Sequence, residues 1–172
     1  MKRLLSILAP VFLLLCGFNQ SYADDKIAPA IQAVDLNGQP INLQDYQGKV
    51  VYLDFWASWC PPCAKSFPEL NQLYNELKEE GFEIIALSVD KHKKDLDKFL
   101  EKHPVDFLIA WDKKGISPER YHVQTMPSGF LIDRQGIMRY KFRGFKQGSE
   151  QKIKQYAQML LDEKATSATE TK

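Results

Sequence analysis

Cysteine is scarce in this sequence. The 172-residue chain contains three cysteines, Cys16, Cys60 and Cys63, and Cys16 lies in an apolar stretch near the N-terminus. Without that stretch a single pair remains, which is too little for a structural disulfide framework. Two thiols separated by two residues close a small disulfide or open into a dithiol. The scarcity of cysteine therefore favours a chemical role for Cys60 and Cys63.

Neither sign of charge is in excess. The chain has 23 Lys and Arg, 22 Asp and Glu, and a formal net charge of +1. Nucleic-acid-binding domains are typically strongly basic, and membrane-surface helices carry clustered basic residues. We therefore expect neither nucleic acid nor a membrane surface as a partner. The short basic runs at residues 91–94 and 113–114 are interpreted as solvated surface, where most charged side chains lie.

Long hydrophobic runs are missing, with one exception at the N-terminus. Two basic residues precede an almost wholly apolar stretch, residues 4–18. This stretch is shorter than the roughly 20 residues that a membrane span needs. Small residues ending in Ala23 then occupy the positions that a signal peptidase reads. We expect residues 1–23 to be a signal peptide; an uncleaved membrane anchor and lipidation at Cys16 are the alternatives.

The remaining chain has no internal repeat and no dividing linker. We expect one domain over residues 24–163, followed by a polar, disordered tail at residues 164–172. Apolar patterns predict strands at residues 31–35, 41–43, 50–56, 83–90, 105–110, 129–133 and 137–142. They predict helices at residues 61–80, from about 96 to Pro104, at 116–121, and after a Ser149 cap.

This order of elements predicts an α/β fold with a mixed central sheet. Residues 50–56 are β-rich without alternation, as expected for a strand that is covered on both faces. Asn37-Gly38 predicts an N-terminal β-hairpin, because Asn-Gly is a strong hairpin turn signal. Pro68 lies inside the first helical pattern and should kink that helix.

The cysteine pair falls where a strand is expected to lead into a helix. Pro61 is well tolerated in a first helical turn, which places Cys60 at the helix N-terminus. The helix dipole and free N–H groups there favour an exposed thiolate, while Cys63 lies one turn further in and is expected to be shielded. Asp54 ends the apolar strand and is expected to be buried, with a raised pKa. It is interpreted as a proton relay for Cys63 or as a hydrogen-bonded strand-end carboxylate.

Other interpretations of these residues are weaker. A lone pair of cysteines is half a zinc site, and the scattered His92, His103 and His122 do not complete it. We therefore expect no metal and no cofactor. Trp56 and Trp59 are interpreted as packing residues, and Trp59, beside the reactive sulfur, is also a candidate for substrate contact.

The stretch around both cysteines carries a family likeness. Residues 54–63, Asp-Phe-Trp-Ala-Ser-Trp-Cys-Pro-Pro-Cys, resemble the active site of thioredoxin-like proteins. Specifically, they resemble exported TlpA/ResA-type thiol-disulfide oxidoreductases of the redoxin (AhpC/TSA) superfamily. The lead-in at residues 35–38, the strand entry at 48–51 and Met126-Pro127 follow the family's order. The resemblance spans roughly residues 29–161.

The resemblance implies a thioredoxin fold with a cis peptide bond at Pro127, packed against the cysteine pair. In the family this loop pairs with an extended substrate segment by strand addition, which assigns substrate binding to Met126 and Pro127. Trp59 and Pro61 are expected to contribute beside the reactive sulfur. Asp54 matches the buried acid of thioredoxin.

Two residues depart from the family's pattern. Many cytochrome-maturation members have a glutamate three residues after the second cysteine, where this chain has Ser66. Met126 precedes Pro127 where a threonine is common. Ser66 weakens an assignment to apocytochrome reduction, and Met126 leaves redox tuning and substrate choice open.

These observations predict a periplasmic thiol-disulfide oxidoreductase that reduces disulfides of exported proteins and is regenerated by a membrane thiol-electron donor. The reducing direction follows from Pro61 and Pro62, which carry no positive charge to stabilise a strongly acidic Cys60. A thiol peroxidase of the same fold is one alternative, although Ala57 stands where the peroxidase pattern has threonine. A non-enzymatic Cu(I) carrier is another, because thiolates suit Cu(I).

Overall fold

The structure is a computed structural model that describes residues 26–163. The predicted signal peptide and the predicted disordered tail lie outside these residues. The strands are β1 (Lys26–Ile27), β2 (Ala33–Asp35), β3 (Pro40–Ile41), β4 (Val50–Trp56), β5 (Phe82–Ser88), β6 (Leu108–Trp111), β7 (Ser128–Ile132) and β8 (Ile137–Arg143). The helices are η1 (Leu43–Tyr46), α1 (Pro61–Leu77), η2 (Lys78–Glu80), α2 (Lys93–Lys102), α3 (Ile116–Arg120) and α4 (Ser149–Asp162).

The strands of the described residues form one mixed sheet, as predicted. Its eight strands follow the order β1-β8-β7-β4-β5-β6-β2-β3. The neighbours β4, β5 and β6 are parallel, whereas β7 pairs antiparallel with both β4 and β8. None of the helices within these residues has the length and apolar character to cross a membrane.

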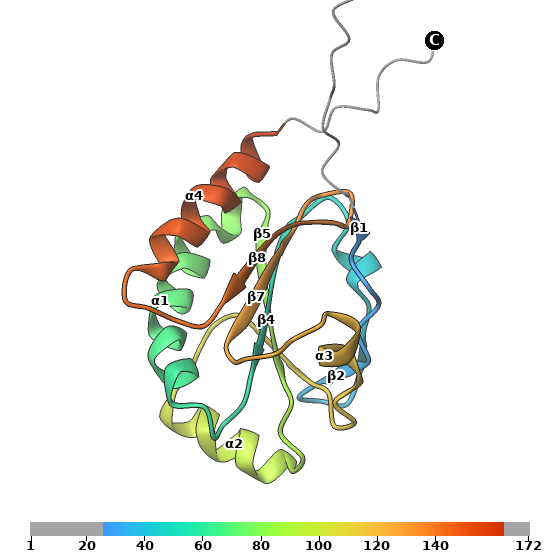
Figure 1. Ribbon diagram of the computed structural model, residues 1–172, viewed down its shortest axis with the longest axis vertical. Helices are drawn as coiled ribbons and strands as arrows, with labels where there is room; N and C mark the ends of the chain where they lie inside the picture. The colour runs from blue at the N-terminus through green and yellow to red at the C-terminus, as the bar shows by residue number, and fades with distance from the viewer. Residues whose placement is uncertain (1–25, 164–172) are drawn as a thin grey trace, which may run out of the picture.

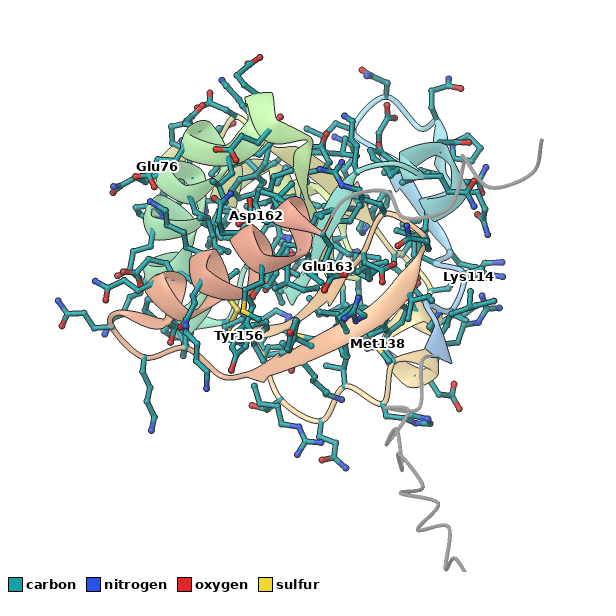
Figure 2. All side chains as sticks on the ribbon, turned by 90° about the horizontal axis from the view of Figure 1, so that it is seen from above. Glu76, Lys114, Met138, Tyr156, Asp162 and Glu163 are labelled. Carbon is teal, nitrogen blue, oxygen red and sulfur yellow. A yellow bond between two sulfur atoms is a disulfide. The ribbon has the colours of Figure 1, made fainter. Side chains whose placement is uncertain are left out.

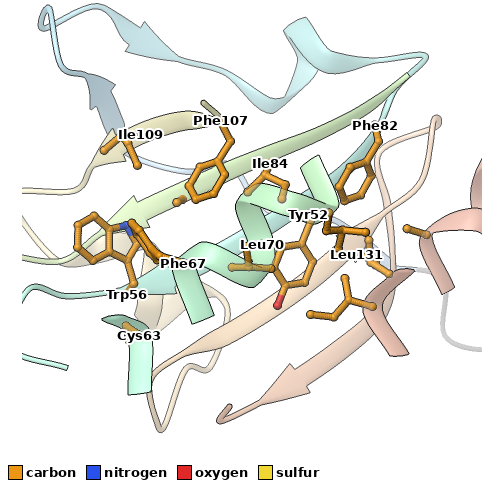
Figure 3. Close-up of a cluster of buried hydrophobic side chains, with 14 of the residues drawn as sticks. Tyr52, Trp56, Cys63, Phe67, Leu70, Phe82, Ile84, Phe107, Ile109 and Leu131 are labelled. Atoms are coloured by element: carbon orange, nitrogen blue, oxygen red, sulfur yellow. The ribbon is translucent and has the colours of Figure 1, made fainter. Parts of the chain in front are cut away.

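Strand β4 lies in the middle of this sheet and is covered on both faces. All seven of its residues are buried. Because side chains alternate along a strand, Tyr52 and Trp56 point to one face, while Leu53 and Phe55 point to the other. Helices α1, α2 and α4 pack on the first face, and α3 with the N-terminal segment covers the second (Figure 1). Figure 3 shows the first core, in which Trp56 lies close to Cys63.

The predicted N-terminal hairpin is confirmed as β2 and β3. Its turn is stabilised by Asp35, whose Oδ1 accepts hydrogen bonds of 2.8 Å from the backbone N–H groups of Asn37 and Gln39. Gly38 adopts a φ of +84°, which other residues rarely tolerate. Because β2 also pairs with β6, the hairpin extends the edge of the main sheet.

Helix α1 follows the predicted pattern closely. It begins at Pro61, continues through Pro68 and passes into η2, which ends at Gly81 with a φ of +91°. This left-handed glycine is the usual residue just past a helix end. The predicted apolar stripe faces the sheet through the buried side chains of Phe67, Leu70, Leu73 and Leu77. The stripe anchors the helix that carries both cysteines.

Several predicted strand boundaries differ from the structure by one to three residues. The strand expected from residue 105 begins at Leu108 instead. The backbone N–H of Asp106 donates to the Asn71 side chain on α1, and the Asp106 carboxylate accepts from Asn71 and Asn75. These bonds to α1 hold residues 105–107 outside the sheet.

The cap of α4 also differs from the prediction. Gly148, with a φ of +85°, occupies the N-cap position, and Ser149 is the first helical residue. The Ser149 hydroxyl instead accepts a hydrogen bond of 3.0 Å from the backbone N–H of Lys146. Ser149 therefore stabilises the loop before α4, which lies close to the candidate site described below.

Gly129 on β7 allows an unusually close approach. A Cβ atom at this position would lie 1.9 Å from the Tyr52 hydroxyl oxygen on the neighbouring strand β4. The absence of a side chain therefore lets the Tyr52 ring lie over β7. Gly129 is also the residue opposite Asp54 in the pairing of β7 with β4, so Asp54 has no side chain next to it on that strand.

Candidate active site

Cys60 and Cys63 form a disulfide at the point where β4 leads into α1. Their Cα atoms are 5.3 Å apart, which one helical turn provides. Strand β4 ends at Trp56, and a tight turn follows, in which the Cys60 N–H donates to the Ala57 carbonyl. Pro61 then starts the helix. The expected strand-to-helix junction is thus present.

The two cysteines are not equivalent. Cys60 is the N-cap of α1, and its sulfur accepts a hydrogen bond of 3.3 Å from the Cys63 backbone N–H. A helix N-terminus with a free N–H directed at sulfur favours a thiolate. Cys63 is fully buried, whereas Cys60 keeps 5 % of its surface exposed. The expectation of a well-exposed first sulfur is wrong, because both cysteines belong to the apolar core under α1.

Trp59 supplies the exposed apolar surface at this site. It is 68 % exposed, so its interpretation as a packing residue is wrong. It borders an open groove of about 640 Å³ that is also lined by Cys60, Pro61, Phe99, Lys102 and His103. Trp56, in contrast, packs in the core with its ring centroid 4.7 Å from those of Phe67 and Phe99, as predicted.

Among the described residues, Asp54 is buried beneath α1 without a hydrogen-bond partner. It is 1 % exposed, and neither carboxylate oxygen has a partner among residues 26–163. Its neighbours across the sheet are Ala86 and Gly129, which have no polar side chain to offer. Burial raises the pKa of Asp54 well above its ordinary value of 3.8. Among the described residues, Asp54 therefore has no side-chain or backbone partner of the kind expected for a hydrogen-bonded strand-end carboxylate.

A cavity of about 240 Å³ opens beside Asp54. Ser66 lines it from α1, and Pro127 and Gly129 line it from the start of β7. The Ser66 hydroxyl donates to the Cys63 carbonyl at 2.9 Å, so the residue at the family's glutamate position contacts the backbone of the second cysteine. The cavity thus brings together the predicted acid, the loop of Pro127 and the helix of the cysteines.

The Met126–Pro127 peptide bond is cis, as the resemblance implied. Pro127 is buried, and its carbonyl accepts a hydrogen bond of 2.8 Å from the Gly144 N–H. Met126 is half-buried and packs against the core that contains both cysteines. Within the described residues, the backbone N–H and C=O of Met126 make no hydrogen bond. They are therefore free to pair with another chain.

Asp90 is a site residue that the sequence analysis missed. It lies just past the end of β5, is 2 % exposed, and holds the turn before the cysteines. Its carboxylate accepts hydrogen bonds from the Ser58 N–H at 2.9 Å, from the Ser58 hydroxyl at 2.8 Å and from the Ser88 hydroxyl at 2.8 Å. The signal that singled out Asp54, an aspartate ending an apolar strand, also applies to Asp90.

Within residues 26–163, no group of three or more His, Cys, Asp and Glu side chains is arranged to hold a metal ion. His92 precedes α2, His103 follows it, and His122 follows α3. The structure therefore does not bring these three histidines to the cysteine pair, although His103 lines the groove beside Trp59.

Residues 25–141 match the AhpC/TSA family. The chain belongs to this family. Among curated members, the thiol-disulfide oxidoreductase ResA of Bacillus thuringiensis subsp. konkukian is 36 % identical over 135 residues, covering 78 % of this chain and 77 % of the relative. ResA of Halalkalibacterium halodurans is 32 % identical and covers 92 % of this chain and 94 % of the relative.

A solved structure supports the same family placement. A Chlorobium tepidum protein assigned as a thiol:disulfide interchange protein DsbE has a TM-score of 0.76 and 39 % identity, covering 80 % of this chain and 96 % of that chain. The predicted thioredoxin-like α/β fold is thereby confirmed. Together with the Cys60–Cys63 disulfide, these relatives make this AhpC/TSA member a thiol-disulfide oxidoreductase of the ResA/DsbE kind.

Burial of Asp54 makes the free energy of unfolding depend on pH. The folded-state pKa lies well above the ordinary 3.8, so the folded state binds more protons between the two values. Protonated Asp54 contributes its full share to the free energy of unfolding below about pH 4, and this contribution is lost as pH rises through the folded-state pKa. In Asp54→Asn, the free energy of unfolding, measured by urea denaturation across this range, should fall less steeply with pH. Parallel profiles for both proteins would contradict this assignment.

Removing the Asp90 carboxylate should loosen the turn before Cys60. Asp90→Ala leaves the donors of Ser58 and Ser88 without their buried acceptor. We expect a loss of roughly 3 kcal/mol in the free energy of unfolding, since each hydrogen bond to a charged group contributes about 1.5–3 kcal/mol and the losses are not additive. Urea denaturation of the oxidised protein measures this loss.

Asp106→Ala is the matched control for this experiment. Asp106 also accepts two side-chain hydrogen bonds, but it does so at the surface, where water replaces them. The control should lose much less stability than Asp90→Ala. Equal losses in the two variants would show that burial of the Asp90 network is unimportant.

Proposed function

We propose that this protein reduces disulfides of exported proteins in the periplasm and is itself regenerated by a membrane thiol-electron donor. The observation that carries the proposal is the asymmetry of the cysteine pair. Cys60 caps α1 beside an exposed Trp59, whereas Cys63 is sealed in the core next to the cavity wall formed by Ser66. Such a pair suits one attacking sulfur and one resolving sulfur.

The reaction has two thiol-disulfide exchange steps. The Cys60 thiolate attacks one sulfur of a substrate disulfide, forms a mixed disulfide and releases the other substrate sulfur. Cys63 then transfers its proton to Asp54 and attacks the Cys60 sulfur. The mixed disulfide breaks, the second substrate sulfur leaves as a thiolate, and Cys60–Cys63 forms. Two electrons pass to the substrate, and the membrane dithiol donor returns them by the reverse exchange.

Asp54 suits the role of proton acceptor for Cys63. It is buried, it has no hydrogen-bond partner among the described residues, and burial raises its pKa well above 3.8, so its carboxylate is a stronger base than an exposed aspartate. A general base works best when its pKa lies near the working pH. Water in the cavity would connect Asp54 to the region beneath the cysteine helix.

The substrate is proposed to bind as an extended segment along Met126. The free backbone N–H and C=O of Met126 suit strand addition, in which main-chain hydrogen bonds hold a peptide. Trp59 and Pro61 are both exposed and provide apolar surface on either side of Cys60. Apolar surfaces of this kind can contact many different substrate side chains.

The location rests on the N-terminal sequence. The apolar stretch of residues 4–18 and the small residues ending in Ala23 predict export to the periplasm, where oxidants form disulfides. An uncleaved membrane anchor would place the same domain on the same side of the membrane. Either form leaves the cysteine pair able to meet exported substrates.

The exchange mechanism predicts different fates for the two cysteine variants. Cys60→Ser should abolish reduction of a peptide disulfide, because the attacking sulfur is gone. Cys63→Ser should form the mixed disulfide but fail to release it, so the variant accumulates covalently bound substrate. Affinity capture of Cys63→Ser from cells, before and after reduction, measures the accumulated mixed disulfide. Mass spectrometry of the released partner identifies the substrate. Normal turnover by Cys63→Ser would contradict the resolving role.

The reducing direction predicts a low reduction potential. Pro61 and Pro62 carry no charge, so only the helix N-terminus favours the Cys60 thiolate. We expect a potential closer to thioredoxin's, about −270 mV, than to DsbA's, about −120 mV. Tryptophan fluorescence in dithiothreitol redox buffers measures it. A value near that of DsbA would overturn the reductase assignment, and Pro62→His, which adds a cationic neighbour, should raise the potential.

The same assays distinguish thiol-disulfide exchange from the two alternative functions, a thiol peroxidase and a Cu(I) carrier. A peroxidase would consume peroxide without exchanging disulfides, but the residue in the peroxidase threonine position is Ala57, which offers only its carbonyl to Cys60. A Cu(I) carrier would retain the metal tightly and show negligible exchange. Covalent capture of a substrate through Cys60 excludes both as the main activity.

A further inference from the structure

Three carboxyl groups line the cavity beside the cysteine helix, and the mechanism above uses one of them. Asp54 lines it from β4, Glu69 from α1 and Glu150 from the first turn of α4. Asp54 is buried, whereas Glu69 and Glu150 are half-buried and have contact with solvent. The cavity therefore connects a sealed carboxyl group to a pair at the protein surface. Its volume of about 240 Å³ has room for several water molecules.

Glu69 and Glu150 form a carboxyl pair. Both side chains line the same cavity, and Glu150 is the neighbour that acts most strongly on Glu69. One oxygen of each, Oε2, is buried and has no hydrogen-bond partner among the described residues. The neighbouring Glu150 carboxyl group, followed by burial, raises the pKa of Glu69 to about 7. A pair of this kind both accepts and releases a proton near neutral pH.

The charged groups around the cavity leave this pair without an ion-pair partner. Lys141 and Arg143 line the cavity from β8, Lys146 from the following loop and Lys152 from α4. None of them forms a salt bridge with Asp54, Glu69 or Glu150 among residues 26–163. Lys141 instead donates hydrogen bonds to the carbonyls of Tyr121 and His122. Tyr52 is the remaining titratable group, and burial raises its pKa.

We propose that the Glu69–Glu150 carboxyl pair is the outlet of a proton relay, meaning that it passes the proton of Asp54 to bulk solvent. Asp54 is thereby deprotonated again after each resolution step. Cys63 gives its proton to Asp54 as the Cys60–Cys63 disulfide forms. Asp54 passes the proton through water in the cavity to the pair, and the pair releases it to bulk solvent. The leaving substrate thiolate takes its own proton from solvent, so charge balances. During re-reduction, the same path supplies the proton that Cys63 requires.

The inference rests on the proposed role of Asp54. A carboxyl group sealed in an apolar core exchanges protons slowly unless a hydrogen-bonded path reaches the surface. The geometry supplies the two ends of such a path along one cavity: an acid inside that has no partner among the described residues, and a carboxyl pair in contact with solvent. A purely structural pair would link α1 to α4 but would not control proton exchange at Asp54.

Kinetics of the Glu69→Gln/Glu150→Gln double variant test this outlet. Stopped-flow tryptophan fluorescence follows Cys60–Cys63 formation after mixing reduced protein with a peptide disulfide in dilute buffer. At pH 7 we expect the resolution rate to fall roughly tenfold, less than the loss of a direct acid–base group would cause. The inflection of the wild-type rate near pH 7 should disappear. Added imidazole, a small diffusible proton carrier, should restore the rate in proportion to its concentration.

Glu76→Gln is the matched control. Glu76 also lies on α1 and also bonds to α4, through Lys154 at 2.8 Å, but Figure 2 shows it pointing outward from the helix. Its removal should leave the pH profile unchanged. A wild-type rate and profile in the double variant would overturn the outlet. A slower rate that keeps the inflection and ignores imidazole would mean a structural role, and would also overturn it. If the double variant does not fold, each single variant is measured instead.

Asp54→Asn separates failure of the outlet from failure of the proposed mechanism. Slow resolution in Asp54→Asn together with a normal Glu69→Gln/Glu150→Gln double variant would leave the Asp54 role intact and remove only the outlet. Normal resolution in Asp54→Asn would contradict the relay as a whole. Retained disulfide exchange in either case would leave the assignment of the cysteines unchanged.

Discussion

The direct passage from a fully buried strand into a helix N-terminus is the constraint on which this site depends. Strand β4 is held on both sides by β5 and β7 and is covered on both faces, so its end has little freedom. The turn after Trp56 delivers Cys60 to the N-cap of α1, where its sulfur meets the Cys63 N–H. The pairing with β7 places the cis bond of Pro127 at the same end of the sheet. The position of each functional group is therefore set by β4.

Two buried aspartates at neighbouring strand ends show how hydrogen-bond partners separate similar residues. Asp90 accepts hydrogen bonds from Ser58 and Ser88 and keeps the turn in place. Asp54 has no donor within reach among the described residues, because Ala86 and Gly129 flank it. A satisfied buried carboxylate stabilises structure, whereas an unsatisfied one binds a proton. The fold thus gives one aspartate a structural role and leaves the other available for chemistry.

Much of the fold was predictable because apolar periodicity and turn residues act locally. Strand β4, helix α1 and the hairpin around Gly38 lie where their patterns predicted. The late start of β6 arose where side chains from a distant element intervene, because Asn71 and Asn75 on α1 hold residues 105–107 out of the strand. No local pattern relates these residues. The cap of α4 differs for a local reason, since the Ser149 hydroxyl accepts from the Lys146 N–H and Gly148 takes the N-cap position.

The sequence by itself determined the cysteine pair, the helix start at Pro61, the strand that carries Asp54 and the family likeness, because all of these reside in contiguous residues. Only the tertiary structure decided how the pair is exposed, that Trp59 faces solvent and that Asp54 has no hydrogen-bond partner within residues 26–163. It alone brings Glu69 and Glu150 to one cavity from two helices. Burial, the proximity of charges and the shape of a cavity are properties of packing, and packing joins segments that are far apart along the chain.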